Sequence, residues 1–527
     1  MADGKTYQTE VNIDVNTRQW NLEAGTEYRF ELDPGTTVAI KLAHGQAEIF
    51  GAELAEGSVY LFGFECKAAV YTWQGCTIEM STTTCFASPH FPPCAYIDCL
   101  FYSYVIGLPS TEYVSDETPM HAYANVHLAL EQMRVRALRT VHGSPPSSDD
   151  EADTDANPEP PRVLVLGPEN SGKTTVAKIL VNYAVRTGQD WTPMLLNTDP
   201  GEGGWAVPGA IAAAPISSPI QTSTPATTLG CAASSAPTHL TSNALLPLAY
   251  WYGHAETKRN PLLMDRLIRN LGDNVAERWD HDVESRVSGL IVDTPSSFAA
   301  SSGAQNEHRH ALIKACVDAF KINVILVVGH EKLNVEMQRT YGNRMTVVKI
   351  PKSGGVVELD ASYRERVRKY QLQNYMYGKI LQPPPGLSTK MYLQGGEQIP
   401  DLTLNLAPVS SIVSFGDLTL YRIGEETMAP TSALPIGATR VVSEMQPLLV
   451  DPAQPGSGLY NAVLALLAPP NPDEHERYDE EILDLPVVGF LVVTALDIPN
   501  KRMTILSPSQ GSLVGRTAIV GSFEWQE

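Results

Sequence analysis

The sequence predicts a multidomain α/β protein with an N-terminal β-sandwich, a central parallel α/β domain and a smaller β-rich α/β C-terminal domain. Its 527 residues exceed the usual size of one domain, and a hydrophobic fraction of 43% is enough to build large cores. Near Arg162 short alternating apolar runs give way to continuous apolar runs separated by helical segments, and near Lys379 the alternating runs return. Alternation is typical of antiparallel sheets with one solvated face, whereas continuous apolar runs are typical of parallel sheets buried on both faces.

The composition excludes several classes of protein. The 38 Lys and Arg residues against 59 Asp and Glu residues give a net charge of −21, which excludes nucleic-acid binding through overall positive charge. The 7 Cys residues lack repeated CxxC spacing, so neither a disulfide framework nor a zinc site is indicated. The N-terminus is polar, and the apolar run Leu100–Leu108 is too short to span a bilayer. We therefore expect a soluble, intracellular protein.

The first predicted domain covers residues 1–120. Short β-type runs between Tyr7 and Ser81, broken at turn signals such as PGT and EGS, favour an antiparallel sandwich. Residues 85–110 differ from their surroundings because Cys, Pro and aromatic residues are concentrated there. This stretch is either a loop that packs on the sheet or an inserted segment, and we assign it as an insertion.

Three further segments follow. Residues 121–161 contain apolar residues at helical spacing between His121 and Leu138, and then an acidic, proline-rich stretch that is typical of a disordered linker. Residues 162–378 have the pattern of a parallel α/β domain, interrupted by a Ser/Thr/Ala/Pro-rich stretch, residues 212–243, that we expect to be a flexible insertion. Residues 379–527 are expected to form the C-terminal domain.

The central domain opens with a phosphate-binding motif. The stretch Gly167–Thr174 matches GxxxxGK[ST] and lies between an apolar strand and a helical run, which is the context the motif requires. Backbone N–H groups of such a loop and of the following helix N-terminus face phosphates, the lysine adds a positive charge, and the hydroxyl can bind Mg²⁺. The sequence therefore predicts a P-loop NTPase-type domain that binds a nucleoside triphosphate. The expected ligands are Gly167, Asn170, Ser171, Gly172, Lys173, Thr174 and Thr175.

Two carboxylates follow predicted strands of the same domain. Asp199 ends the run PMLLNTD, and Asp293 ends GLIVDT. Because ligands of parallel sheets bind at the carboxyl ends of the strands, we expect both near the phosphates. With Thr174 they are the candidate metal ligands, and either of them is a candidate general base toward a hydroxyl. The alternative is that each only caps the turn that follows it.

Several stretches around the loop resemble one family. EYRFEL, GQAEIFGAEL, AVYTWQGCTIE, NTDPGEG and PKSGGVVE resemble the polynucleotide 5′-hydroxyl-kinase family, in particular its fungal-type branch that serves as a subunit of the pre-mRNA cleavage and polyadenylation factor. The resemblance implies a sandwich that reaches over the nucleotide, with ATP and Mg²⁺ as cofactors. It also implies that an acidic and a basic residue lie near the adenine, here Glu31 and Lys67. Without the resemblance, both would be read as exposed strand charges.

The chain departs from the active members that it resembles. The active pattern DxGQ is replaced here by Asp199 and Gly201 followed by Glu202, whose carboxylate repels phosphate. The pattern TxGW is absent, since Asp293 is followed by Thr-Pro-Ser-Ser and then by Phe298, which remains a candidate for stacking on a base.

The expected lid helix departs as well. It keeps Arg364, Arg366 and Arg368, but Gln371 and Gln373 occupy the positions closer to its end. An arginine at a transferring phosphate contributes about 10³–10⁵ in rate in analogous systems, so the departures affect transfer more than binding. An amphipathic helix whose arginines are merely solvated is the alternative.

The leading hypothesis is an ATP-binding structural subunit, required for pre-mRNA cleavage and polyadenylation, that holds ATP with little or no turnover. The rival is an active polyribonucleotide 5′-hydroxyl kinase in which Asp199 is the base and Arg368 stabilises the transition state. A nucleotide-hydrolysing switch is the weakest reading, because no NKxD motif is present. The resemblance implies nuclear location and other cleavage-factor subunits as partners, including the one that binds the polymerase tail. We expect RNA contact to be indirect and no membrane contact.

Overall fold

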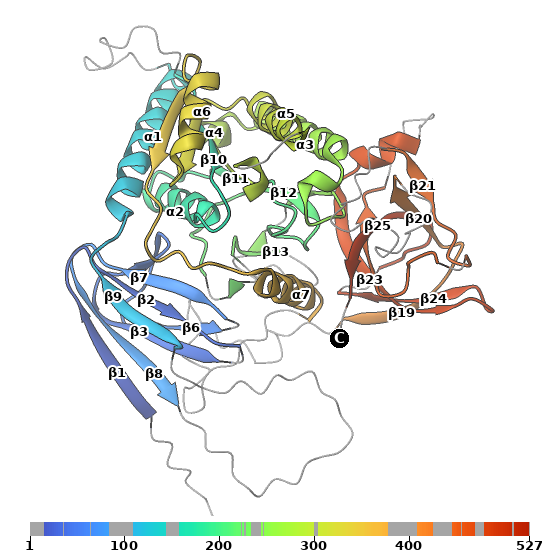
Figure 1. The fold of residues 1–527 in the computed structure, drawn as a ribbon, viewed down its shortest axis with the longest axis horizontal. Coiled ribbons are helices and arrows are strands. Elements are labelled where there is room, and N and C mark those ends of the chain that lie inside the picture. The colour runs from blue at the N-terminus through green and yellow to red at the C-terminus, as the bar shows by residue number, and fades with distance from the viewer. Residues whose placement is uncertain are drawn as a thin grey trace, which may run out of the picture.

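The computed structural model describes residues 15–34, 36–63, 65–83, 109–143, 158–222, 224–225, 228–232, 244–245, 247–299, 304–377, 408–424, 445–454, 456–469, 479–508 and 511–525. The chain forms three successive parts (Figure 1): a sandwich drawn in blue, a central domain drawn from cyan to yellow-brown, and a C-terminal domain drawn in orange and red. The central domain lies between the other two. This arrangement confirms the predicted fold class.

The N-terminal part is a sandwich of two antiparallel sheets. In the described residues one sheet has the order β1-β8-β3-β6, and the other has the order β5-β4-β7-β2-β9. Alternate side chains of β2, such as Tyr28 and Phe30, enter the core between the sheets. The strands are β1 (Val15–Leu22), β2 (Glu27–Glu31), β3 (Thr37–Gly45), β4 (Glu48–Ile49), β5 (Ala52–Glu53), β6 (Val59–Gly63), β7 (Lys67–Tyr71), β8 (Cys76–Thr83) and β9 (Thr111–Ser115).

Strand β9 was not predicted from the sequence. It pairs with β2, with Thr111 opposite Glu31, and so completes the sheet that faces the central domain. The predicted insertion at residues 85–110 lies outside the described residues except for its last two positions. The acidic stretch of the predicted linker lies outside them as well.

Helix α1 (Met120–Val141) connects the sandwich to the central domain and contains the helix predicted from the sequence. Its buried residues Tyr123 and Leu130 pack with α2 and with one face of the central sheet. Arg134 is buried in this contact and donates from Nε to the carbonyl oxygen of Ser288 at 2.9 Å. The helix therefore belongs to the packing of the central domain as much as to that of the sandwich.

The central sheet is mixed, with the order β15-β12-β11-β16-β10-β17-β18 in the described part of the chain. Its five strands from β11 to β18 are parallel, as predicted, whereas β12 and β15 are added antiparallel at one edge. Helices α1 and α2 cover one face, and α3, α5 and α6 cover the other. The strands are β10 (Arg162–Leu166), β11 (Met194–Asn197), β12 (Ala210–Pro215), β15 (Leu248–Trp251), β16 (Leu290–Asp293), β17 (Val324–Val328) and β18 (Thr346–Ile350). The helices are α2 (Lys173–Arg186), α3 (Pro261–His281), α4 (Val283–Val287), α5 (Ala304–Ala319), α6 (Glu331–Tyr341) and α7 (Ala361–Tyr377).

The predicted flexible insertion at residues 212–243 is wrong at its start. Ala212 and the residues after it belong to β12, which pairs with β11 from Ala212 to Pro215 and is almost fully buried. The small side chains of this strand suggested low complexity, but they fit a strand that is covered on both faces. Ile220 and Leu229, further along, are buried in the same core as α2. Residues 233–243 lie outside the described part.

The C-terminal part is β-rich, with the sheet order β19-β24-β23-β22-β25-β20-β21 among its described residues. Those residues form strands and one 3-10 helix, Asp479–Asp484, but no α-helix, so the helical share expected for this domain is not found in them. The sheet packs on the central domain where Trp251 lies 5.4 Å from Phe490 and 6.2 Å from Phe523, measured between ring centroids. The strands are β19 (Val409–Ser414), β20 (Leu418–Ile423), β21 (Pro447–Leu449), β22 (Ala462–Leu467), β23 (Val487–Asp497), β24 (Arg502–Ser507) and β25 (Arg516–Glu524).

None of the helices in the described residues has the length and the apolar character needed to cross a membrane.

Candidate nucleotide-binding site

A cavity of about 860 Å³ lies between the sandwich, the phosphate loop and α7. Most of the residues predicted for the site line this cavity. Gly167 and Asp293 are outside the lining set, although Asp293 contacts a residue that belongs to it. The predicted residues that line the cavity are Glu31, Lys67, Asn170, Ser171, Gly172, Lys173, Thr174, Thr175, Asp199 and Arg368.

The phosphate loop has the backbone that its glycines permit. Gly172 has a φ of +87°, and a Cβ at Gly167 would lie 2.6 Å from the Ser171 hydroxyl oxygen, so larger residues do not fit. Ser171 donates from its hydroxyl to the carbonyl oxygen of Pro168 at 2.8 Å. Lys173 also donates from Nζ to this oxygen, at 3.1 Å, so its ammonium is folded onto the loop. The loop thus surrounds a position for an anion.

Beside the loop, the Thr174 hydroxyl oxygen lies between two carboxylates. It is 2.7 Å from Asp293 Oδ2 and 3.1 Å from Glu202 Oε2. Asp293 ends β16 and is fully buried, and its other oxygen, Oδ1, has no hydrogen-bond partner. Burial, followed by the negative charge of Glu202, raises the pKa of Asp293.

Asp199 lies in the turn after β11, where it accepts a hydrogen bond from the backbone N–H of Gly201 at 2.9 Å. Burial and the charge of Glu202 raise the pKa of Asp199 as well. The structure therefore brings both predicted carboxylates to the phosphate loop. Asp199 thus also has a capping contact in its turn, whereas the side chain of Asp293 contacts Thr174.

These residues fit a magnesium ion that keeps phosphate and water among its ligands. No group of three or more His, Cys, Asp and Glu side chains within the described ranges forms a metal cage. Mg²⁺ in nucleotide sites needs none, because it is bound through one or two carboxylates and the phosphates. The unpartnered Asp293 Oδ1 and the hydroxyl of Thr174 are oxygen donors of the kind that it prefers.

The predicted base-reading pair is in contact on the sandwich side of the cavity. Lys67 Nζ on β7 lies 2.5 Å from Glu31 Oε2 on the neighbouring strand β2. Sequence reasoning missed two other charged residues, Glu27 and Arg29, that line the same cavity. They share one face of β2 with Glu31, since side chains two apart on a strand point the same way. This two-residue spacing was the available signal, but the sequence does not tell which face is covered.

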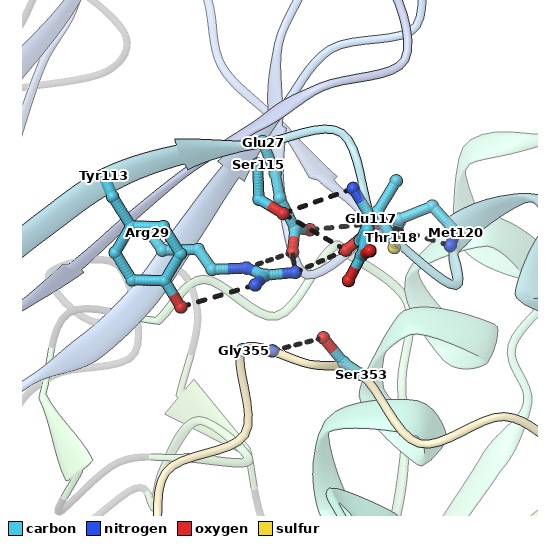
Figure 2. A network of polar contacts seen from close by, with 9 residues as sticks. All are labelled: Glu27, Arg29, Tyr113, Ser115, Glu117, Thr118, Met120, Ser353 and Gly355. Carbon is cyan, nitrogen blue, oxygen red and sulfur yellow. Dashed lines mark hydrogen bonds and ion pairs between the residues drawn. The ribbon is translucent and has the colours of Figure 1, made fainter.

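Arg29 lies beside Gly355 of the loop that precedes α7 (Figure 2). Its guanidinium is paired with Glu27, donates to the hydroxyl of Tyr113 at 3.3 Å, and donates to the carbonyl oxygen of Glu117 at 2.6 Å. A Cβ at Gly355 would lie 2.6 Å from Arg29 Nε, so the loop approaches the guanidinium as closely as glycine allows. The PKSGGVV stretch is thus part of the interface between the sandwich and the central domain.

Helix α7 closes the cavity from a third side. Arg364 donates to Asn170 Oδ1 of the phosphate loop at 2.6 Å, and Arg366 donates to both carboxylate oxygens of Glu65 in the sandwich, at 3.0 and 2.7 Å. Arg368 lines the cavity, and burial lowers its pKa. The predicted lid arginines are therefore not merely solvated.

Two of the sequence departures have a structural outcome. Gln371 of α7 is buried and donates from Nε2 to the backbone oxygen of Glu202 at 2.7 Å, so it holds the segment that carries this carboxylate. Phe298 is fully buried in the core of the central domain. The suggestion that Phe298 stacks on a base is therefore wrong, because its ring is not available to a ligand.

Three family models match the chain. The model described as mRNA cleavage and polyadenylation factor CLP1 P-loop matches residues 167–378. The N-terminal beta-sandwich domain of polyadenylation factor matches residues 21–137, and the Pre-mRNA cleavage complex II protein Clp1 matches residues 406–527.

Full-length relatives show the same similarity. The mRNA cleavage and polyadenylation factor CLP1 of Laccaria bicolor is 67% identical over 510 residues, which cover 97% of this chain and 98% of the relative. The Protein CLP1 homolog of Arabidopsis thaliana is 31% identical over 516 residues, which cover 97% of this chain and 95% of the relative.

Two solved structures share the fold. A complex of wild-type Clp1p with part of Pcf11p has a TM-score of 0.73 at 22% identity, covering 98% of this chain and 99% of that one. A second structure, which concerns the interface between Pcf11p and Clp1p and the loss of ATP in a glycine-to-arginine mutant, has a TM-score of 0.72 at 22% identity, with 97% and 99% covered.

Proposed function

Because this chain belongs to the Clp1 family of mRNA cleavage and polyadenylation factors, we propose that it is an ATP-binding structural subunit of the nuclear cleavage and polyadenylation factor. In this role it holds ATP with little or no turnover. The observation that carries the proposal is the contrast at Thr174: an unbroken phosphate loop lies beside Glu202, a carboxylate 3.1 Å from the hydroxyl that the metal needs. Negative charge at this position opposes the approach of a second anionic substrate.

The residues of the cavity have separate tasks in this proposal. Lys173 exchanges its contact with the Pro168 carbonyl oxygen for the outer phosphates, and Thr174, with Asp199 and Asp293 close by, holds the cation. When bound, Mg²⁺ supplies the positive charge that neutralises the triphosphate and these carboxylates. Gly167, Asn170, Ser171, Gly172 and Thr175 provide the backbone around the phosphates, and Glu31 with Lys67 faces the adenine.

The partner in this proposal is the cleavage-factor subunit that binds the polymerase tail. The solved complex that shares this fold contains Clp1p together with part of Pcf11p, which supports a partner of this kind. We place any RNA contact in the assembly rather than in this chain alone, because the net charge of −21 opposes it. The domain limits 1–120, 121–161, 162–378 and 379–527 remain predictions.

A second function, a polyribonucleotide 5′-hydroxyl kinase, is favoured by one observation. Asp199, whose pKa is raised by burial, and Arg368 line the same cavity, so a base and a cation for the transition state are both present. In that case Asp199 removes the proton of the RNA 5′-hydroxyl and Arg368 stabilises the transferring phosphate.

One experiment separates the two functions. The full chain is purified without added nucleotide and denatured, and the released nucleotide is identified and counted; the same sample is assayed for transfer of labelled γ-phosphate to 5′-OH RNA. One ATP per chain without transfer is the expected result. Transfer that disappears in Asp199→Asn, but persists in Asp265→Asn on the distant surface of α3, makes the protein a kinase and rejects the structural role.

A further inference from the structure

The hydroxyl of Thr174 has too few hydrogens for the oxygens around it. It carries one hydrogen, yet Asp293 Oδ2 lies at 2.7 Å and Glu202 Oε2 at 3.1 Å. When the hydroxyl donates to one carboxylate, its lone pairs face the other. While both carboxylates are ionised, the hydroxyl can donate to only one of them, and the other keeps its negative charge without that hydrogen bond.

A second observation concerns the other oxygen of Asp293. Asp293 is fully buried and its Oδ1 has no partner, although a buried carboxylate oxygen normally accepts a hydrogen bond or binds a cation. Lys173 donates to the Pro168 carbonyl oxygen rather than to either carboxylate, although its charge partly offsets the effect of burial on the pKa of Asp293. An oxygen-binding cation would fit beside the carboxylates of Asp293 and Glu202.

Glu202 is held in place from behind. Gln371 of α7 donates to its backbone oxygen at 2.7 Å, and Glu202 and Gly203 donate their backbone N–H groups to the Asp199 carbonyl oxygen at 3.1 and 3.2 Å. Its carboxylate is thus directed at Thr174 by a tight turn and by the lid helix. An amide at this position would offer one oxygen and no charge.

We propose that Glu202 is a ligand of the divalent cation, together with Asp293 and the hydroxyl of Thr174, and that this chain binds the cation even without nucleotide. The inference deepens the proposed function, because a cation already bound at the loop strengthens the hold on the triphosphate. Two carboxylates, a hydroxyl and water meet the preference of Mg²⁺ and Mn²⁺ for oxygen ligands. The carboxylate that opposes an acceptor thereby strengthens nucleotide binding.

The test uses the full chain after nucleotide is stripped and Mn²⁺ as the probe. The free Mn²⁺ signal in electron paramagnetic resonance is titrated with wild type, Glu202→Gln and Glu256→Gln, and bound Mn²⁺ is then displaced with Mg²⁺. Glu256 lines the same cavity but pairs with Lys258, so it is a matched control. We expect one Mn²⁺ per chain in wild type and in Glu256→Gln, and an affinity at least tenfold lower in Glu202→Gln.

The outcomes are distinct from those of the proposed function. Equal Mn²⁺ affinity in wild type and Glu202→Gln, with unchanged thermal unfolding, overturns the inference whether or not ATP turns over. Absence of Mn²⁺ binding in nucleotide-free wild type overturns it too. A Glu202→Gln chain that unfolds is replaced by Glu202→Asp, which keeps the charge and should bind Mn²⁺ within about threefold of wild type if the carboxylate is the ligand.

Discussion

The phosphate loop and the wall that faces it are built in different ways. The loop is one contiguous stretch, Gly167–Thr174, in which Ser171 and Lys173 both donate to the Pro168 carbonyl oxygen of the loop itself. The facing wall is assembled from β2 and β7 of the sandwich, the loop before α7 and α7 itself, and one contact between its parts joins Glu65 to Arg366. A nucleotide that is held by the phosphate loop and covered by the facing wall connects parts of the chain that are distant in sequence. This difference is what a nucleotide with a structural role requires.

The largest expected effect comes from the loop. Lys173→Ala removes the charge that faces the outer phosphates, so the purified chain should contain no ATP. ATP at a thousandfold excess over its Kd contributes about 4 kcal/mol to stability, and the variant should lose that share. Nucleotide content after denaturation and thermal unfolding measure both effects.

Lys349→Ala is the control for this prediction. Lys349 pairs with Glu331 on the surface of the central domain, where a salt bridge contributes roughly 0–1 kcal/mol. Full ATP content in Lys173→Ala would show that the facing wall, and not the loop, holds the nucleotide.

Lys178 belongs to α2 but faces the assembled wall. It is 1% exposed, donates to the Thr222 hydroxyl at 2.5 Å and lies 5.3 Å from the ring centre of Phe50. Burial lowers its pKa from 10.5 to about 8. Between these two values the unfolded chain binds more protons than the folded one, so this group makes stability rise as pH rises through the window.

Lys178→Met should therefore flatten the rise in stability between pH 8 and pH 10.5. A pKa lowered from 10.5 to about 8 corresponds to about 3 kcal/mol. Between these pH values the free energy of unfolding of wild type should therefore rise by up to about 3 kcal/mol more than that of the variant. Chemical denaturation at several pH values measures the difference, and Lys258→Met, at an exposed lysine, is the control. Parallel curves for Lys178→Met and wild type would contradict the assignment of a buried charge.

Gly355→Ala tests the fit between the sandwich and the loop before α7. Its Cβ would lie 2.6 Å from Arg29 Nε, and Arg29 has little freedom to move because Glu27, Tyr113 and Glu117 all hold it. Overpacking of this kind costs about 1–3 kcal/mol. Thermal unfolding should show this loss, whereas Gly416→Ala, where an added Cβ meets nothing within 4 Å, should change little. Equal unfolding temperatures for Gly355→Ala and Gly416→Ala would mean that the contact between Arg29 and the loop adjusts to the added Cβ at little cost.

The sequence predicts the loop from its own pattern, but it predicts the wall only at residues that the family resemblance supplied, such as Glu31, Lys67 and Arg368, and the reason is physical. A phosphate loop is specified by local spacing and by glycine backbone angles, so Gly172 and Lys173 could be assigned without a structure. The sandwich was predicted from alternation, which fixes the faces of β2 but not which face another domain covers, and so Glu27 and Arg29 were missed. Ala212 and Phe298 were assigned wrongly because small or aromatic side chains do not reveal their burial. The contact between Glu65 and Arg366 leaves no sequence signal, since either residue alone is an ordinary surface charge.

The smallest expected effect concerns that contact. Arg366 donates to both oxygens of Glu65, and Tyr363, which lines the cavity, donates its hydroxyl to the Glu65 backbone oxygen at 3.3 Å, so α7 is fastened to the sandwich. An exposed ion pair contributes only about 0.2–1 kcal/mol, so Arg366→Ala should speed the release of a fluorescent ATP analogue about twofold to fivefold. Added salt should produce the same acceleration in wild type and little in the variant.

Arg269→Ala is the control, because it removes a surface pair with Asp265 on α3 and should leave the release rate unchanged. Equal release rates for Arg366→Ala and wild type at low salt would mean that the lid is held by its buried residues, Gln371 among them, and that the assembled wall acts through packing rather than charge.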